Sequence, residues 1–189
     1  NVLRNKIKKI NKTRNLQRYR RRKNNLPIVS LVGYTNSGKS TLFNSLTKAD
    51  VISKDMLFAS LDSTIRKIYI KNNKLVIVDT VGFIKSLPTD LIAAFKSTLD
   101  EIIDSDVILH VRDVSNLEHL NQKNEVLKIL NELGIENNDS RIIDVINKID
   151  LVKIKDETFL NSQNSIITSA LNGEGINDLK EKLYEMIFK

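Results

Sequence analysis

The chain has 189 residues, which predicts one domain with an appendage rather than two full domains. Its composition, 41% hydrophobic and 28% charged residues with no cysteine and two histidines, is typical of a globular protein and excludes disulfides, thiol catalysis and cysteine-zinc sites. The net charge of +7 is uneven, because residues 1–25 hold eleven Lys and Arg and no acid; 30 minus 11 leaves 19 basic against 23 acidic residues in the rest, a net charge of −4.

The basic segment 1–25 is predicted to be the end of a helical linker. Its Leu3, Ile7 and Ile10 recur at helical spacing, and Pro27 follows the segment as a breaker. A solvated linker and an RNA-binding helix are both open interpretations. The charge asymmetry favours contact with an anionic partner such as RNA.

Three further expectations concern the whole chain. It does not begin with Met, so we expect a fragment of a longer protein. No apolar run approaches the roughly 18 residues of a membrane span and no signal-peptide core is present, so we expect no membrane span and a cytoplasmic location. We also expect a monomer.

After Pro27, strand and helix patterns alternate. The predicted strands span 28–32, 65–71, 74–79, 107–111, 142–146 and 166–167. The predicted helices span 39–48, 89–103, 116–133, 156–162 and 175–188. Alternation of this kind predicts an α/β fold for residues 26–189, with a mostly parallel six-stranded sheet and helices on both faces. Asn72-Asn73 predicts a tight hairpin turn and therefore one antiparallel edge pair.

The first motif follows strand 28–32 and opens helix 39–48. Gly33-Tyr34-Thr35-Asn36-Ser37-Gly38-Lys39-Ser40 matches the phosphate-loop pattern G-x-x-x-x-G-K-[ST]. The glycines allow the backbone to wrap around phosphate, and successive amides at a helix N-terminus attract the anion. Lys39 is expected to reach the terminal phosphates, and the Ser40 hydroxyl to bind Mg²⁺.

The second motif, Asp79-Thr80-Val81-Gly82, ends strand 74–79. An acid there can hold Mg²⁺ through water, and the glycine amide can meet the terminal phosphate. The sequence D-x-x-G is weak alone, but its position about 40 residues after a phosphate loop makes it informative.

Two further motifs follow later strands and suit base recognition. In Asn147-Lys148-Ile149-Asp150, a carboxylate can accept two hydrogen bonds from guanine, and adenine offers no such edge. Ser169-Ala170 follows the last strand, where a backbone amide could meet guanine O6. The four motifs in this order define a P-loop GTPase.

Longer stretches narrow the resemblance. These are Gly33 to Asn44, Leu57-Phe58-Ala59-Ser60-Leu61-Asp62-Ser63-Thr64, and Asp79 to Ile84 with Leu87-Pro88 and Leu91-Ile92-Ala93-Ala94-Phe95. Together they resemble the HflX family of ribosome-associated GTPases, over the chain from about Arg18 to the C-terminus. The resemblance implies a GTPase that binds the large ribosomal subunit and its rRNA and can act in ribosome splitting or rescue. It also implies a missing N-terminal domain, with the basic segment as the end of the linker.

The motifs and the resemblance together imply the site residues. The implied nucleotide contacts are Gly33, Tyr34, Thr35, Asn36, Ser37, Gly38, Lys39, Ser40, Thr41, Phe58, Ala59, Ser60, Leu61, Asp62, Asp79, Thr80, Val81, Gly82, Asn147, Lys148, Ile149, Asp150, Ser169, Ala170 and Leu171. Ser40, Ser60 and, through water, Asp79 are the expected Mg²⁺ ligands, and Thr64 is the rival to Ser60. The chain departs from the family at Ser60, Ser63, Ile65 and Arg112, where Thr, Pro, Thr and an apolar residue are usual.

Catalysis is assigned to Lys39 and Asn36. Many GTPases orient the attacking water with a Gln after D-x-x-G, but this position is Phe83, so slow intrinsic hydrolysis and stimulation by a partner are expected. Asn36 resembles an Asn of bacterial GTPases that use K⁺, which makes K⁺ a candidate cofactor. His110 is expected to be structural and His119 solvated. The alternatives are a non-catalytic GTP-dependent RNA-binding module and a GTPase of the Obg or Era type, against which the D-T-V-G-F-I stretch argues.

Overall fold

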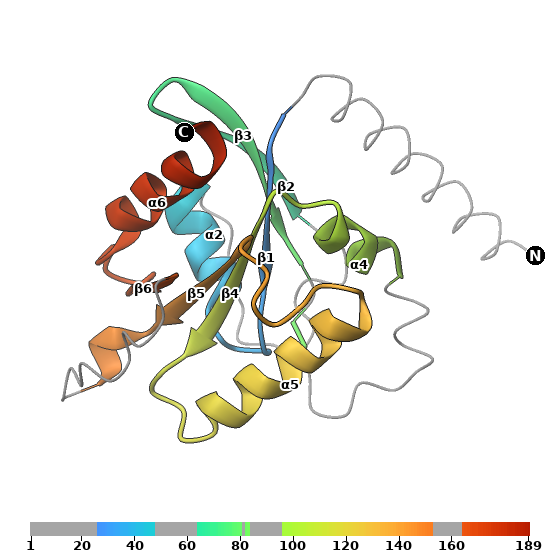
Figure 1. The fold of residues 1–189 in the computed structure, drawn as a ribbon. Helices are drawn as coiled ribbons and strands as arrows, with labels where there is room; N and C mark the ends of the chain where they lie inside the picture. The colour runs from blue at the N-terminus through green and yellow to red at the C-terminus, as the bar shows by residue number, and fades with distance from the viewer. Residues whose placement is uncertain (1–25, 48–63, 81, 84–95, 153–163) are drawn as a thin grey trace, which may run out of the picture.

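The computed structural model describes residues 26–47, 64–80, 82–83, 96–152 and 164–189 (Figure 1). Its sheet has six strands in the order β2-β3-β1-β4-β5-β6. The strands are β1 (Ile28–Val32), β2 (Thr64–Ile70), β3 (Asn73–Asp79), β4 (Val107–Asp113), β5 (Ile142–Asn147) and β6 (Ser165–Ile167). Only the pair β2 and β3 is antiparallel, so the predicted α/β fold with one antiparallel edge pair is confirmed.

Helices cover both faces of the sheet (Figure 1). The described helices are α2 (Lys39–Thr47), α4 (Lys96–Ile103), α5 (His119–Glu132) and α6 (Ile176–Phe188), with a 3-10 turn, η1, at Ile149–Leu151. Side chains of α2 and α6 pack with the sheet in one core cluster, whereas those of α4 and α5 pack in a second cluster. The buried strands β1, β4 and β5 are nearly continuous apolar runs, as expected for parallel strands covered on both faces.

The carboxyl ends of the parallel strands lie at one end of the molecule, and the β2–β3 turn lies at the other (Figure 1). The loop between β1 and α2 and the loops after β3, β4 and β5 therefore share one end of the sheet. This is the end at which α/β proteins of this type bind ligands.

The β2–β3 turn differs from the prediction by one residue. The sequence suggested Asn72-Asn73, but Lys71 and Asn72 form the turn with φ values of 46° and 67°, and Asn73 already pairs with Ile70. Two successive left-handed residues match the right-handed twist of the flanking strands, which is why tight hairpins favour them. Lys71 is accepted there although lysine does not favour positive φ.

The start of α5 was also predicted too early. The sequence suggested residue 116, but the helix begins at His119. The Asp113 carboxylate accepts a hydrogen bond from the Ser115 N–H, and the Asn116 side-chain oxygen accepts one from the Glu118 N–H. These local turns compete with helix formation. The predicted elements at 1–25, 89–95 and 156–162 lie outside the described residues.

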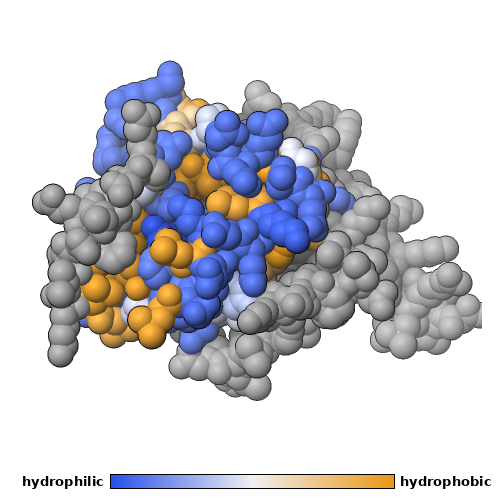
Figure 2. Space-filling model, turned by 60° about the horizontal axis from the view of Figure 1, so that its bottom comes forward, coloured by the Kyte–Doolittle hydropathy of each residue, from blue (hydrophilic) through white to orange (hydrophobic). Residues whose placement is uncertain are grey.

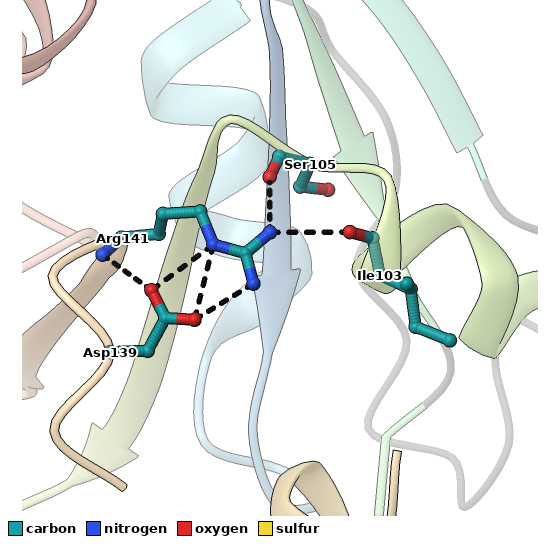
Figure 3. Close-up of polar contacts among 4 residues, drawn as sticks. All are labelled: Ile103, Ser105, Asp139 and Arg141. Carbon is teal, nitrogen blue, oxygen red and sulfur yellow. Dashed lines mark hydrogen bonds and ion pairs between the residues drawn. The ribbon is translucent and has the colours of Figure 1, made fainter. Parts of the chain in front are cut away.

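A clamp around Arg141 fixes the end of α4 (Figure 3). The guanidinium donates hydrogen bonds to the backbone oxygens of Ile103 and Ser105 at 3.2 and 3.0 Å and forms an ion pair with Asp139 at 2.8 Å. Carbonyl groups at a helix C-terminus lack partners within the helix, so a basic side chain there stabilises it. The clamp joins α4 to the segment before β5.

Candidate nucleotide site

The phosphate-loop backbone depends on two glycines. Gly33 has a φ of 153°, and a Cβ atom there would lie 2.1 Å from the Val111 carbonyl oxygen of β4. Gly38 has a φ of 92°, and its Cβ would lie 2.3 Å from Asn147 Nδ2. Any larger residue at either position would push the loop away from the neighbouring strand end. Asn36 also has a positive φ, 62°, and its side chain is exposed.

Lys39 is buried at the start of α2. Its ammonium group donates hydrogen bonds to the backbone oxygens of Gly33 and Tyr34, at 3.1 and 2.9 Å. Burial lowers the pKa of Lys39 to about 8, and the nearby Asp79 carboxylate opposes that shift. The loop therefore holds its lysine folded against its own carbonyl groups.

Ser40 and Asp79 form the part of the site that suits a divalent cation. The Ser40 hydroxyl donates a hydrogen bond to Asp79 Oδ2 at 2.9 Å. The other carboxylate oxygen, Oδ1, is buried without a hydrogen-bond partner, and burial raises the pKa of Asp79. A hydroxyl beside a buried acid with an unused oxygen fits Mg²⁺, which binds oxygen ligands and usually keeps several waters.

Of the two rival Mg²⁺ hydroxyls, Thr64 is described and Ser60 is not. Thr64 begins β2 and pairs in register with Asp79. The part of the chain that the structure describes contains no group of three or more His, Cys, Asp or Glu side chains that could hold a metal ion. A bound Mg²⁺ would thus depend on hydroxyls, one acid, water and phosphate.

Asn147 joins the phosphate loop to the loop after β6. Its Nδ2 atom donates to the Ser37 carbonyl at 3.0 Å, and its Oδ1 atom accepts from the Ala170 N–H at 3.0 Å and from the Thr168 hydroxyl at 3.2 Å. One buried amide thus fixes both loops relative to β5. The contribution of Thr168 was not predicted, because no spacing in the sequence pairs it with Asn147.

The remaining side chains that the sequence predicts to recognise the base also lie at this end. Lys148 has a φ of 65°, and its ammonium group pairs with Asp113 at 2.8 Å. Asp150 is exposed, and its Oδ1 atom accepts a hydrogen bond from the Ser169 hydroxyl at 2.5 Å. Sequence reasoning missed Asp113, although its place at the end of a buried strand, like that of Asp79, was a usable signal.

Phe83 is tied to the phosphate loop through its backbone. Its N–H donates to the Gly33 carbonyl at 3.0 Å, and its carbonyl accepts from the Thr35 N–H at 2.7 Å. The ring is only 4% exposed and packs with α4 and α5. Gly82, just before it, lies close to Lys39 Nζ, which would be 3.0 Å from an added Cβ atom. Gly82 and Phe83 therefore lie directly against the phosphate loop.

A buried ionic network supports the adjacent strand ends. Arg112, 6% exposed, donates to Asp144 Oδ1 at 2.8 Å, and Lys123 pairs with the other oxygen at 2.8 Å. Burial alone would raise the pKa of Asp144, but these two cations lower it overall. The apolar residue usual in the resembled family is therefore replaced here by an arginine with its own acidic partner.

The two histidines differ in how they match their predictions. His110 is fully buried, and burial lowers its pKa to about 4, so it is neutral, which agrees with a structural role. The prediction of a solvated His119 is wrong. It is half-buried, and its Nδ1 lies 2.9 Å from Arg112 Nη1. Arginine can only donate, so this nitrogen accepts, and burial and Arg112 lower the pKa of His119.

The structure thus brings together most of the predicted site. Figure 2 turns this end of the molecule forward and shows hydrophilic residues over much of the described surface, with hydrophobic residues between and beside them. Leu171, directly after Ser169-Ala170, is among the exposed apolar residues. The predicted site residues outside the description are Phe58, Ala59, Ser60, Leu61, Asp62 and Val81.

The fold, the phosphate loop and the loops after β3, β5 and β6 define a P-loop GTPase domain. A family profile described as "50S ribosome-binding GTPase" matches residues 28–148, so the chain belongs to that family.

Individual relatives support the finer resemblance to HflX. The chain is 45% identical over 185 residues to GTPase HflX of Caldanaerobacter subterraneus subsp. tengcongensis, covering 97% of this chain and 42% of that protein. It is 40% identical to GTPase HflX of Escherichia coli, over 98% of this chain and 44% of that protein. The structure also resembles the crystal structure of a GTP-binding protein from Sulfolobus solfataricus in complex with GDP. The two superpose with a TM-score of 0.68 and are 30% identical in sequence, over 94% of this chain and 61% of that one. The chain spans less than half the length of these two HflX proteins. None of the described helices combines the length and apolar character that crossing a membrane requires.

Proposed function

We propose that this chain binds GTP with Mg²⁺, hydrolyses it to GDP and phosphate, and does so in association with the large ribosomal subunit and its rRNA. The Asn147 amide carries the proposal, because it bonds to the phosphate loop and to the Ser169-Ala170 loop at once. A protein that only needed a stable turn would have no use for a buried side chain spanning both loops. Membership of the family and the identity to HflX proteins supply the ribosomal part.

The roles of the phosphate-binding residues follow from their positions. The phosphate-loop amides and the N-terminus of α2 would bind the phosphates, and Lys39 would exchange its two carbonyl contacts for phosphate oxygens. Ser40 and Asp79, with Ser60 or Thr64, would hold Mg²⁺. A bound Mg²⁺ would neutralise charge that develops on the phosphate oxygens during transfer.

Base selection would use the exposed Asp150 carboxylate and the Ala170 N–H. The carboxylate would accept from the guanine edge. The Ala170 N–H, which donates to Asn147 Oδ1 in this structure, would share its hydrogen with O6 or exchange that bond for it. The Ser169 hydroxyl already orients Asp150, so the acid is held for this contact before nucleotide arrives. Lys148 would lie along the base, anchored by Asp113.

Intrinsic hydrolysis should be slow, because the residue after Gly82 is a buried phenylalanine and cannot orient water. The missing group would come from a ribosomal element or from K⁺ held with the help of Asn36. The exposed carboxamide of Asn36 in the phosphate loop is free to face such a cation. Action in ribosome splitting or rescue is the wider role that the HflX resemblance suggests.

The buried Phe83 also favours the second candidate, a GTP-dependent RNA-binding module without turnover. Multiple-turnover phosphate release from GTP and from ATP, with large subunits, small subunits and bare rRNA added separately, separates the two. Turnover of GTP alone, raised by large subunits, is the expected result. Binding of GTP without turnover under every condition would overturn catalysis, and equal use of ATP would overturn base selection.

A further inference from the structure

Apart from Asp79, which ends β3 at the nucleotide site, every charged residue of the β2–β3 hairpin is basic. Residues 64–78 include Arg66, Lys67, Lys71 and Lys74 and no Asp or Glu. Arg66 and Lys67 are exposed, and neither forms an ion pair with another described residue. The hairpin is thus a concentrated cationic element on a domain whose net charge outside residues 1–25 is negative.

Three of its side chains line one face. Tyr69 pairs with Lys74 across the antiparallel ladder, and the Lys74 ammonium lies 5.9 Å from the centre of the Tyr69 ring. Lys67 is two residues before Tyr69 on the same strand and therefore projects to the same side. The Tyr69 side chain is 67% exposed. We call these three residues, Lys67, Tyr69 and Lys74, the basic hairpin face.

Lys71 at the turn is excluded from this face because it already has partners. Its ammonium group pairs with Glu181 of α6 at 2.5 Å and lies 4.7 Å from the centre of the Tyr184 ring. This contact fixes the turn against α6. The charges of Lys67 and Lys74 remain available to a partner.

The basic hairpin face lies far from the nucleotide site and close to the start of β1. The turn occupies the end of the sheet opposite the phosphate loop (Figure 1). The Val76 N–H of β3 donates to the Pro27 carbonyl at 2.8 Å. Pro27, near the start of the described residues, therefore lies beside β3 of this hairpin.

We propose that the basic hairpin face binds RNA, with Lys67 and Lys74 on phosphates and Tyr69 stacked on an unpaired base. Flexible RNA segments are recognised by aromatic stacking combined with cationic contacts to the backbone. The alternative partner is a protein with an acidic surface. Protein interfaces, however, bury an apolar core between the two partners. The apolar side chains near this face are buried within the domain. Ile68, Ile70 and Leu75 lie on the opposite side of the hairpin in the main core cluster. Val76 lies on the same side as its cross-strand partner Lys67 but is only 1% exposed. This inference rests on the proposed ribosomal function and adds a surface to it.

The test compares the intact chain with three variants. Lys67→Gln/Lys74→Gln removes two charges from the face, and Tyr69→Ala removes the ring. Lys128→Gln/Lys189→Gln removes the same charge from exposed positions on α5 and at the C-terminus and is the matched control. Affinity for a fluorescein-labelled single-stranded oligouridylate of about 12 nucleotides, and for isolated large subunits, is measured over a series of salt concentrations.

The double lysine variant should bind the oligonucleotide more weakly, and its slope of log affinity against log salt should be shallower by about 1.4, since each lost phosphate contact removes about 0.7. Tyr69→Ala should lose at least about fivefold in affinity with an unchanged slope, because stacking releases no counterions. Circular dichroism and GTP affinity, which should match those of the intact chain, show that the variants are folded.

Three other results would overturn the proposed RNA contact. Face variants that bind RNA like the control overturn the inference and leave the proposed function intact. Loss of subunit binding with unchanged oligonucleotide binding would assign the face to a ribosomal protein and overturn the RNA contact. An intact chain that binds no RNA overturns the inference as well, and phosphate release stimulated by large subunits, measured in parallel, then reports separately on the proposed function.

Discussion

Asp150 is the residue on which guanine selection should depend. It is exposed, and the Ser169 hydroxyl holds its Oδ1 atom. Asp150→Asn should weaken guanine binding by about 2–4 kcal/mol, because a charged pair of hydrogen bonds is lost. The variant should prefer xanthine, whose 2-oxo group can accept from the new amide. Titration of fluorescent GDP and XDP against both proteins measures this, and unchanged guanine affinity would contradict the assignment.

Lys39 should make nucleotide affinity depend on pH just above neutrality. Its pKa in the free protein is about 8 because of burial. Bound phosphates favour the charged form and raise that pKa, so binding takes up a proton once the free lysine has lost it. Affinity for GDP should be nearly constant below about pH 7 and fall by about fourfold from there to about pH 8.5. Calorimetry in buffers of different ionisation enthalpy would detect the proton uptake.

The control for this experiment is Lys39→Met, which cannot titrate. The affinity of this variant for GDP should be much weaker than that of the native chain and should not change over the same range of pH. A parallel fall in the variant would assign the pH dependence to another group and contradict the role of Lys39. Measurements stop at about pH 8.5 so that ionisation of guanine itself does not enter.

Asn36 should confer a dependence on K⁺. Its side chain is exposed in the phosphate loop, and Phe83, which contacts that loop through its backbone, has no polar side chain to complete the site. A cation near the phosphates would stabilise charge that develops in the transition state, and its loss should slow hydrolysis by roughly tenfold. GTPase rates are compared in K⁺ and Na⁺ at equal ionic strength for the native chain and Asn36→Ala. Equal rates in both salts, with and without ribosomes, would remove the idea.

At the scale of elements, the Arg141 clamp should hold α4 in place (Figure 3). Arg141→Ala removes donors from the Ile103 and Ser105 carbonyls, and because the site is partly exposed water replaces some of the loss. The free energy of unfolding should fall by about 1 kcal/mol. Arg66→Ala, which removes an exposed arginine, is the control and should leave the urea midpoint nearly unchanged.

The Arg141 clamp should also make the free energy of unfolding depend on pH in the acid range. Arg141 lowers the pKa of Asp139 through their hydrogen bonds. A carboxyl group whose pKa is lower in the folded state stabilises the fold above its unfolded pKa, about 3.9, and that stability is lost as the pH falls through the folded value. The difference between the native chain and Arg141→Ala should therefore narrow below about pH 4. A constant difference would show that the ion pair adds nothing.

The sequence predicted elements well where one local pattern determined them. Every described strand and α-helix was expected, because buried parallel strands and amphipathic helices have distinct periods. The 3-10 turn at Ile149–Leu151 was not predicted, and the predicted start of the 89–103 helix lies outside the described residues. The errors fell where side chains compete with the backbone, as in the Asx turns before His119, or where a residue adopts an unfavoured conformation, as at Lys71. Cross-strand partners such as Arg112 and Asp144, 32 residues apart, could not be found from spacing.

In the site, too, local motifs were predictable from the sequence and contacts between distant residues were not. Motif spacing was enough to expect the phosphate loop, Asp79 and Asp150 at one end of the sheet. The Asn147 bridge to Ser37 spans 110 residues. It arises only because β5 lies two strands from β1, with β4 between them, so that the end of β5 and the phosphate loop after β1 share one end of the sheet. Contacts of this kind depend on strand order, which a single sequence leaves open.

Within the described residues, the β2–β3 turn beside the basic hairpin face and the nucleotide site lie at opposite ends of the sheet (Figure 1). The phosphate loop and the loops expected to recognise the base lie beyond the carboxyl ends of the strands, while the β2–β3 turn lies at the other end (Figure 1). Pro27 precedes β1 and accepts a hydrogen bond from the Val76 N–H of β3. A ribosome-bound domain arranged in this way could hold RNA without blocking its nucleotide. Removing most of the basic segment 1–25 should then weaken binding to the ribosome and leave nucleotide affinity unchanged.

Deletion of residues 1–23 tests this separation. The segment up to residue 25 carries eleven Lys and Arg and no acid, and each phosphate it neutralises adds affinity that depends on salt. The shortened chain should bind GTP as before but bind large subunits or rRNA more weakly, with the loss shrinking as salt rises. Its slope of log affinity against log salt should be shallower by about 0.7–0.9 for each phosphate contact removed. Identical slopes for the two chains would show that the segment is only a linker, and a loss of GTP affinity would show that it supports the nucleotide site.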